Sequence, residues 1–246
     1  MFDPFGDFDT AGYLRNFEKL KDLEEVKIQE HAFFEANLED ALAYLNAVPG
    51  PLDYENFLEV HSILFRDFYP WAGQDRRMLD TGRLVGKGEV QFEASERCRQ
   101  AVEWGLRMGN DPSAMRRKPG VVMGAFAWGH PFLDGNGRAM LLVHTVLSAR
   151  AGFCIDWPRT RKNDYLRALT AELQTPDKGI LDRYLAPLVR PLTAAEDWIG
   201  QLLALPGLDG SSQKDDNIAY RDNDAAALAR YRDVRRTREQ SLGPDT

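Results

Sequence analysis

Three absences narrow the classes of protein to which this chain of 246 residues can belong. Its two cysteines, Cys98 and Cys154, have no metal-binding spacing, so we expect them to be buried thiols. No stretch approaches the roughly 20 apolar residues that a membrane-spanning helix needs, and the acidic first residues contain no apolar signal segment. The net charge of −7 and the pI near 5.2 argue against a broad nucleic-acid-binding surface.

The composition is typical of a soluble globular enzyme. Hydrophobic residues make up 43% of the chain and charged residues 28%, which is enough apolar content to form a buried core. The length suggests one domain with an appended segment. Because no targeting segment is visible, we expect a cytoplasmic protein, with export as an effector through a specialised machine as the alternative.

Apolar residues recur at helical spacing through most of the chain, which predicts an all-α fold. Gly86 and Gly88, between β-favouring residues, predict one short β-hairpin over 83–92. Residues 205–212 have the composition of a linker, which divides the chain into 1–204 and a partly helical tail. The predicted helices cover residues 22–46, 54–65, 95–108, 121–128, 139–149, 163–173, 179–204 with an interruption near its prolines, and about 225–238.

Residues 130–138, with the sequence HPFLDGNGR, lie at a predicted loop-to-helix junction. The apolar run before them ends at Gly129, and the next helix begins near Asn136 or Gly137. Backbone N–H groups at the start of a helix are unpaired and carry partial positive charge, so they bind phosphate. Gly135 and Gly137 have no Cβ, which lets the backbone close around an oxyanion.

Four side chains of the same stretch suit a site that holds a phosphate chain and a metal. His130 is a candidate general base, because an imidazole titrates near neutrality. Asp134 offers carboxylate oxygens suited to Mg²⁺, which usually binds one or two carboxylates together with substrate phosphates. Asn136 can donate its side-chain amide to a phosphate oxygen, and Arg138 can bind phosphate at two points.

This stretch resembles the signature of the Fic/Doc family, H-x-F-x-[D/E]-G-N-G-R-x-x-R, at every restricted position up to Arg138. The segment 64–76, which contains YPWAG followed by QDR, resembles the part of the family that precedes the signature. Residues 85–92 are similar in place and character to the family's flap hairpin, and 12–16 to its N-terminal entry segment. The resemblance spans roughly residues 10–200.

The resemblance implies a Fic-type helical bundle of about six to eight helices with a small β-hairpin flap. It also implies a protein adenylyltransferase, which moves AMP from Mg²⁺–ATP to a Ser, Thr or Tyr hydroxyl of a target protein. In this expectation His130 is catalytic and Asp134 binds the metal. The nucleotide is bound by the stretch from Gly135 through Asn136 and Gly137 to Arg138.

The flap has an implied role in docking the target. In the family an extended segment of the target pairs with the hairpin, so main-chain hydrogen bonds hold it near the histidine. The alternative is a plain surface hairpin. The residues expected to contact the target are Lys87, Gly88, Glu89, Val90 and Gln91.

The chain departs from the family signature at one position. Leu141 stands where the resemblance expects a second arginine, which helps orient the terminal phosphates of ATP. This leaves open a transferase that uses another nucleotide or phosphate-containing donor. It also leaves open a weakened Fic fold that serves as a binding module. Against a phosphate-transferring variant, Gly137 occupies the position where a lysine is expected in such members.

The regulatory pattern of the family, [S/T]-x-x-x-E-[G/N], is missing from this sequence. Glu55 is the only glutamate followed by Gly or Asn, and the residue four positions before it is Pro51. By resemblance the chain is therefore the toxin half of a pair restrained by a separate small antitoxin, or it needs no inhibition.

Several residues outside the motif have simpler expected roles. We expect Phe132 to lie in the core and His144 to be a core or surface histidine rather than a residue of the site. Arg76 and Arg77 are expected to be solvated surface charges. The arginine-rich helix around 225–238 carries acidic residues among its arginines, which predicts a solvated surface helix.

Overall fold

Two helices form the centre of the molecule, α7 (Pro119–Gly129) and α8 (Asn136–Arg150), in the computed structural model. The structure describes residues 2–88, 90–193, 196–205, 218–220 and 222–243. Every residue of α7 is buried, and so is most of α8. A helix that is apolar on all sides is stable only when other elements surround it, which explains the apolar runs on both sides of the motif.

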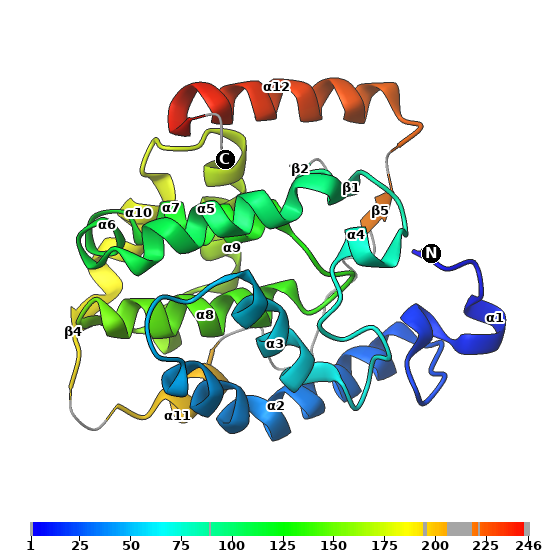
Figure 1. Cartoon of the computed structure of the whole chain (residues 1–246), viewed down its shortest axis with the longest axis horizontal. Helices are drawn as coiled ribbons and strands as arrows, with labels where there is room; N and C mark the ends of the chain where they lie inside the picture. The colour runs from blue at the N-terminus through cyan, green and yellow to red at the C-terminus, as the bar shows by residue number, and fades with distance from the viewer. Residues whose placement is uncertain (1, 89, 194–195, 206–217, 221, 244–246) are drawn as a thin grey trace.

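The remaining helices pack around this pair, as Figure 1 shows, and confirm the predicted all-α class. Within the described residues there are twelve α-helices, more than the six to eight expected, because several have only four to six residues. The additional helices are α1 (Phe8–Ala11), α2 (Leu23–Ala47), α3 (Tyr54–Phe65), α4 (Arg76–Leu79), α5 (Cys98–Asn110), α6 (Pro112–Arg117), α9 (Lys162–Gln174), α10 (Ile180–Leu185), α11 (Trp198–Leu203) and α12 (Ala225–Leu242).

Short side chains let α5 and α7 approach closely. A Cβ on Gly105 of α5 would lie 2.8 Å from the ring of Phe126, and one on Gly129 of α7 would lie 2.8 Å from a methyl group of Val102. Any larger residue at these two positions would push the helices apart. The contact places the end of α7, where residue 130 follows, directly against α5.

Side-chain caps fix the starts of α2 and α3, two helices that pack against α8. Asp22 accepts hydrogen bonds from two backbone N–H groups in the first turn of α2. Asp53 and Asn56 form a capping box at the start of α3, which has the bounds predicted from the sequence. Both helices contact α8. These contacts place α2 beside the first turn of α8, which contains the end of the motif.

Two small antiparallel sheets complete the described fold. The predicted hairpin is confirmed as β1 (Val85–Lys87) and β2 (Val90–Gln91), with Lys87 opposite Val90. A third strand, β5 (Ile218–Tyr220), pairs with the other edge of β1 and gives the order β2-β1-β5. The second sheet joins β3 (Phe153–Ile155) to β4 (Val189–Pro191).

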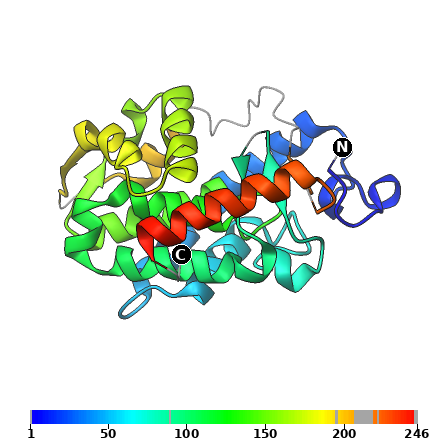
Figure 2. The same cartoon turned by 90° about the horizontal axis from the view of Figure 1, so that it is seen from above.

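Two predictions about the last third of the chain were wrong. The region 179–204 is not one interrupted helix, because β4 replaces its middle and pairs with β3. Helix α12 exists as predicted but is not solvated on all sides, since Tyr231 and Arg238 are buried. Figures 1 and 2 both place it against the helical core rather than apart from it. The division into residues 1–204 and 205–246 stays a proposal.

No helix in the described residues is long and apolar enough to cross a membrane.

Candidate active site

His130 follows the last turn of α7 in a left-handed backbone conformation, with φ of 40°. Such a conformation is strained for a non-glycine residue and turns the chain sharply out of the helix. The imidazole stacks on Phe92, with ring centroids 3.8 Å apart and planes 9° apart. Burial, followed by the positive charges of Arg76 and Lys87, lowers the pKa of His130 well below its usual value. The ring is therefore neutral near pH 7.

The Nε2 atom of His130 is buried and has no hydrogen-bond partner among the described residues. A neutral imidazole nitrogen without a proton can accept one from a hydroxyl group placed beside it. An unpartnered buried nitrogen is uncommon in folded proteins, because its desolvation is not compensated. This atom is therefore ready to bind a group that the chain itself does not supply.

Arg76 fixes the backbone around His130. Its Nε donates to the carbonyl of His130 at 2.8 Å, and its backbone N–H donates to the carbonyl of Pro131 at 2.7 Å. A third bond joins its guanidinium to the carbonyl of Glu93 at 2.7 Å. The expectation that Arg76 is a surface charge was wrong, since its side chain is fully buried. Arg77 is exposed, as predicted.

The side chain of Asn136 closes the loop that follows. Its Nδ2 donates to the carbonyl of Phe132 at 2.8 Å, and its Oδ1 accepts the backbone N–H of Phe132 at 2.9 Å. The predicted contact between Asn136 and a phosphate stays a prediction. Phe132 lies in the core, as expected, and anchors the loop from inside.

His61 of α3 also holds this loop in place through hydrogen bonds of its ring. Gly73 donates its backbone N–H to Nδ1 of His61 at 3.0 Å, so the ring proton is on Nε2 and is donated to the carbonyl of Asp134 at 3.0 Å. Burial lowers the pKa of His61 to about 3, and the ring stays neutral. Gly135 has φ of 74°, and a Cβ there would lie 2.6 Å from Phe65 and 2.9 Å from the His61 ring. The loop therefore requires glycine at this position.

Asp134 lies at the edge of the loop and is partly exposed. Its Oδ1 accepts the backbone N–H of Gly135 at 2.8 Å. The described residues contain no group of three or more His, Cys, Asp or Glu side chains that could hold a metal. A single carboxylate nevertheless fits Mg²⁺, because this ion commonly binds one protein carboxylate and completes its shell with substrate phosphates and water.

Arg138, in the first turn of α8, is bound by a glutamate that the motif did not indicate. Its Nη1 donates to Oε2 of Glu30 on α2 at 2.6 Å, and only 3% of the Glu30 side chain is exposed. Burial and the charge of Asp134 raise the pKa of Glu30 to about 7, although Arg138 acts in the opposite direction. The guanidinium also lies over the ring of Phe34, 5.6 Å from its centroid.

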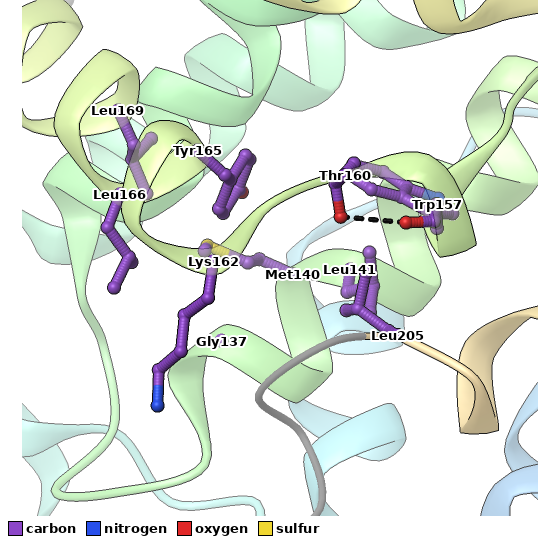
Figure 3. Close-up of a pocket in the computed structure, with 10 residues that line it drawn as sticks. All are labelled: Gly137, Met140, Leu141, Trp157, Thr160, Lys162, Tyr165, Leu166, Leu169 and Leu205. Atoms are coloured by element: carbon purple, nitrogen blue, oxygen red, sulfur yellow. Dashed lines mark hydrogen bonds between the residues drawn. The ribbon is translucent and has the colours of Figure 1, made fainter. Parts of the chain in front are cut away.

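A pocket of about 160 Å³ opens beside the start of α8 and is drawn in Figure 3. Gly137 and Leu141 of α8 form one wall of the pocket, and residues of α9 form the other. Its lining is mostly apolar, and Lys162 carries the only charge among the described residues that line it. In Figure 3 the Lys162 side chain extends from the start of α9 toward the end of the pocket that contains Gly137.

The hairpin residues come directly before Phe92, which stacks on His130. Lys87 is exposed at the end of β1, Val90 is half-buried and Gln91 is buried. Gly88 forms the turn with φ of 59°. Glu89 lies outside the described residues. Phe92, the residue after β2, is the one that stacks on His130, so the hairpin is connected directly to the candidate base.

Sequence reasoning missed three supporting residues, Glu30, His61 and Arg76. Each lies more than fifty positions from its partner in the motif. A single buried charged or imidazole side chain does not produce a repeating pattern in the sequence, so the spacing of apolar residues could not reveal it. The resemblance of residues 64–76 to the family segment could have identified Arg76, because the pattern YPWAG-x-x-R of that segment ends in an arginine at this position.

Comparison with known proteins supports the family resemblance. The model of the Fic/DOC family matches residues 51–148. A probable protein adenylyltransferase of Sinorhizobium fredii, y4lH, is 30% identical over 166 residues, which are 63% of this chain and 81% of that protein. The protein adenylyltransferase VbhT of Bartonella schoenbuchensis is 28% identical over 169 residues. The match covers 68% of this chain but only 35% of VbhT.

Solved structures share the fold. The N-terminal Fic domain of a cell filamentation protein of Bartonella quintana, with bound ADP, has a TM-score of 0.59 at 18% identity. The match covers 80% of this chain and 96% of that one. The BepC protein of Bartonella tribocorum, with bound AMPPNP, has a TM-score of 0.57 at 17% identity and covers 75% of this chain and 95% of that one.

Proposed function

Because the chain belongs to the Fic/DOC family, we propose that it transfers AMP from Mg²⁺–ATP to a hydroxyl group of a target protein. The two similar curated proteins are named as protein adenylyltransferases, which supports this class of reaction. The target carries the reactive Ser, Thr or Tyr. A role as the toxin of a toxin–antitoxin pair, with a separate small antitoxin, is part of the same proposal.

The observation that carries the proposal is the buried Nε2 atom of His130. It belongs to a neutral ring and has no partner in the described part of the chain. In the proposed reaction this nitrogen accepts the proton of the target hydroxyl. The hydroxyl oxygen forms a bond to the α-phosphorus of ATP, the bond to the bridging oxygen breaks, and pyrophosphate leaves with the electron pair.

The donor binds at the start of α8 in this proposal. The first-turn N–H groups of a helix have no intrahelical partner and favour anions, and Gly137 leaves open space where a Cβ would stand. The backbone at Gly137 and the guanidinium of Arg138 bind the phosphates, and Gly135, whose N–H donates to Asp134, allows the backbone to turn closely beside them. Lys162, at the rim of the adjoining pocket, is a further cation for them. Two of the structural neighbours contain ADP or AMPPNP, which is consistent with a nucleotide site.

Asp134 is the residue that would hold Mg²⁺ against these phosphates. When bound, the ion neutralises charge that develops on the phosphate oxygens. The chain's own contribution is the hydrogen bond from the Gly135 N–H to the carboxylate, together with the bond from His61 to the backbone carbonyl of Asp134.

The target is proposed to add a strand to the hairpin at β2. The sheet order β2-β1-β5 leaves β1 paired on both sides and β2 at the edge of the described sheet. The hairpin residues 87–91 contact the target in this arrangement, and main-chain hydrogen bonds would present its hydroxyl to His130.

A second candidate is transfer from a different donor, and the specific observation in its favour is Leu141. This residue lies in the wall of the pocket beside Gly137 and makes that wall apolar. The third candidate is a weakened Fic fold that acts as a binding module.

The test is transfer of label from α-³²P-ATP to proteins of a cell lysate in the presence of Mg²⁺. Wild type should label a band, and His130→Ala should reduce the rate by about 10²- to 10⁴-fold, the usual contribution of a general base. His31→Ala is the control, because this histidine lies on α2 and pairs with Glu35 outside the site.

Parallel reactions distinguish the candidates. Label from γ-³²P-ATP should not be transferred, since the γ-phosphate leaves with pyrophosphate. Transfer from α-labelled GTP, CTP or UTP in preference to ATP would favour the second candidate. An absence of transfer from every nucleotide by a folded protein that still binds them would favour the binding module.

A further inference from the structure

The carboxylate of Glu93 is buried directly beneath the segment that carries His130. Its side chain is 1% exposed. Oε1 accepts the backbone N–H of Ala94 at 2.8 Å, and Oε2 accepts the indole N–H of Trp128 at 3.2 Å. Trp128 lies two residues before His130, on the last turn of α7. Glu93 therefore ties the end of the hairpin to the end of α7.

The backbone of Glu93 makes the same connection twice more. Its N–H donates to the carbonyl of Trp128 at 2.9 Å, and its carbonyl accepts from Arg76, which also binds the carbonyl of His130. The preceding residue, Phe92, stacks on the imidazole. A displacement of Glu93 would thus move two groups that contact His130. One is the phenyl ring of Phe92, which packs against the imidazole, and the other is Arg76, which binds the backbone carbonyl of His130.

Helix α12 supplies the groups that compensate this buried carboxylate. The hydroxyl of Tyr231 donates to Oε1 of Glu93 at 2.5 Å, and Nη1 of Arg235 donates to Oε2 at 2.6 Å. Arg238 of the same helix lies 5.0 Å over the ring of Trp128. Burial and the Glu93 carboxylate raise the pKa of Tyr231, so its hydroxyl remains a donor. Removing one partner of a buried ion pair leaves an uncompensated charge, which is strongly destabilising locally.

We infer that Tyr231 and Arg235 of the C-terminal helix are positioning residues, which hold the candidate base His130 in place by fixing Glu93. The inference rests on the proposed function for its catalytic meaning. Its structural part, the dependence of the His130–Phe92 stack on α12, stands on the contacts alone. The C-terminal helix would then be a component of the active site rather than an appendage.

The experiment compares Arg235→Met with Arg232→Met in the full chain. Arg232 is exposed on the same helix, so it controls for the loss of one arginine and for helix propensity. For Arg235→Met we expect kcat for AMP transfer to fall about tenfold, with KM for ATP unchanged, because α12 does not line the pocket beside Gly137. Arg232→Met should behave as wild type.

A second substitution separates positioning from general support of the fold. Glu93→Gln removes the charge and keeps one acceptor oxygen, which can still accept from Ala94 and Tyr231, while its amide nitrogen replaces the oxygen that faced Trp128 and Arg235. Added to Arg235→Met, it should restore part of the lost kcat, because no unpaired carboxylate remains buried. Loss of activity in Arg235→Met that Glu93→Gln fails to restore would overturn the inference.

A readout that needs no transfer is the NMR signal of the His130 ring protons, assigned by its absence in His130→Ala. Stacking on Phe92 places these protons in the ring current of the phenyl group. In Arg235→Met they should shift toward the unstacked position, and in Arg232→Met they should not. An unchanged signal in Arg235→Met would contradict the inference even if kcat fell.

The two proposals fail in distinguishable ways. If wild type transfers no nucleotide, the proposed function fails while the NMR comparison still decides whether α12 positions the ring. If wild type is active and Arg235→Met retains both kcat and the NMR signal, only the positioning role fails. Should Arg235→Met not fold, Tyr231→Phe removes a single hydrogen bond to Glu93 and permits the same comparison.

Discussion

Glu30 and Arg138 show how a residue distant in sequence changes the chemistry of a motif. The motif arginine is not a free cation, because a buried carboxylate of α2 already binds it. Glu30 is also close enough to Asp134 for their charges to interact unfavourably. A nucleotide triphosphate that enters the site meets this negative charge beside its phosphates. Glu30 therefore orients Arg138 but weakens its attraction for phosphate.

Replacing Glu30 with glutamine should tighten nucleotide binding. Glutamine retains an oxygen that accepts from Arg138, while the charge that repels the phosphates is removed. We expect KM for ATP to fall by about three- to tenfold, in line with a charge interaction of roughly 1 kcal/mol at a partly solvated site. The measurement is the ATP dependence of label transfer. Glu35→Gln is the control, since Glu35 lies on the same helix and pairs with His31. A rise in KM would show that orientation of Arg138 outweighs the repulsion.

Among the structural elements, those with local signals could be predicted from the sequence. Helix α3 has the predicted bounds because the capping box begun by Asp53, just before the helix, marks its start and apolar residues recur at helical spacing along it. The hairpin β1–β2 was recognised from its glycines. Strands β5 and β4 were not, because a three-residue strand is stabilised by its partner and carries almost no pattern of its own. The burial of α12 was missed for the same reason, since its partner Glu93 is specified elsewhere in the chain.

The edge position of β2 leads to a prediction about the target. The N–H of Phe92 donates to the carbonyl of Val85, so the N–H of the preceding residue, Gln91, points away from β1 toward the outer edge of the described sheet. Gln91→Pro removes this donor, and proline is tolerated on edge strands. We expect labelling of lysate proteins to fall about tenfold, the effect of about one main-chain hydrogen bond. Binding of ATP should remain unchanged in calorimetry.

Gln91→Ala is the matched control for this experiment. It keeps the backbone N–H and removes a side-chain amide whose two polar atoms have no partner among the described residues. Its labelling should stay much closer to wild type than that of the proline variant. Equal losses in both variants would argue that the Gln91 side chain, rather than strand addition, holds the target.

At the scale of the whole molecule, the fold contains three histidines that stay neutral, two of them fully buried, and they make the stability of the protein depend on pH. The sequence left His144 as either a core or a surface histidine, and it indicated His130 as the candidate base, which stays a prediction. It could not show that His61 is also buried, because an isolated histidine in an amphipathic helix can face either way. Burial lowers the pKa of His61 to about 3 and that of His144 to about 4, and it lowers the pKa of His130 as well.

These shifts predict the direction in which stability changes between pH 6.5 and 4.5. In this range a histidine is protonated in the unfolded chain, where its pKa is near 6.5, but stays neutral in the folded core. Stability from the three histidines is therefore complete above pH 6.5 and is lost as the pH falls. Glu30 acts in the opposite direction, since its pKa of about 7 lies above the unfolded value, and it offsets about one histidine. The net result is a loss of stability on acidification.

His144→Gln isolates one of these contributions. Nε2 of His144 lies 2.9 Å from the carbonyl of Pro119, and a glutamine amide can donate to that carbonyl without titrating. In the wild type each buried histidine contributes a slope of about 1.4 kcal/mol of unfolding free energy per pH unit. Urea unfolding at several pH values between 6.5 and 4.5 should give a slope smaller by about that amount in His144→Gln. Equal slopes in the two proteins would mean that His144 accepts a proton in the folded state, so the core around α7 and α8 must then admit water or open at mildly acidic pH.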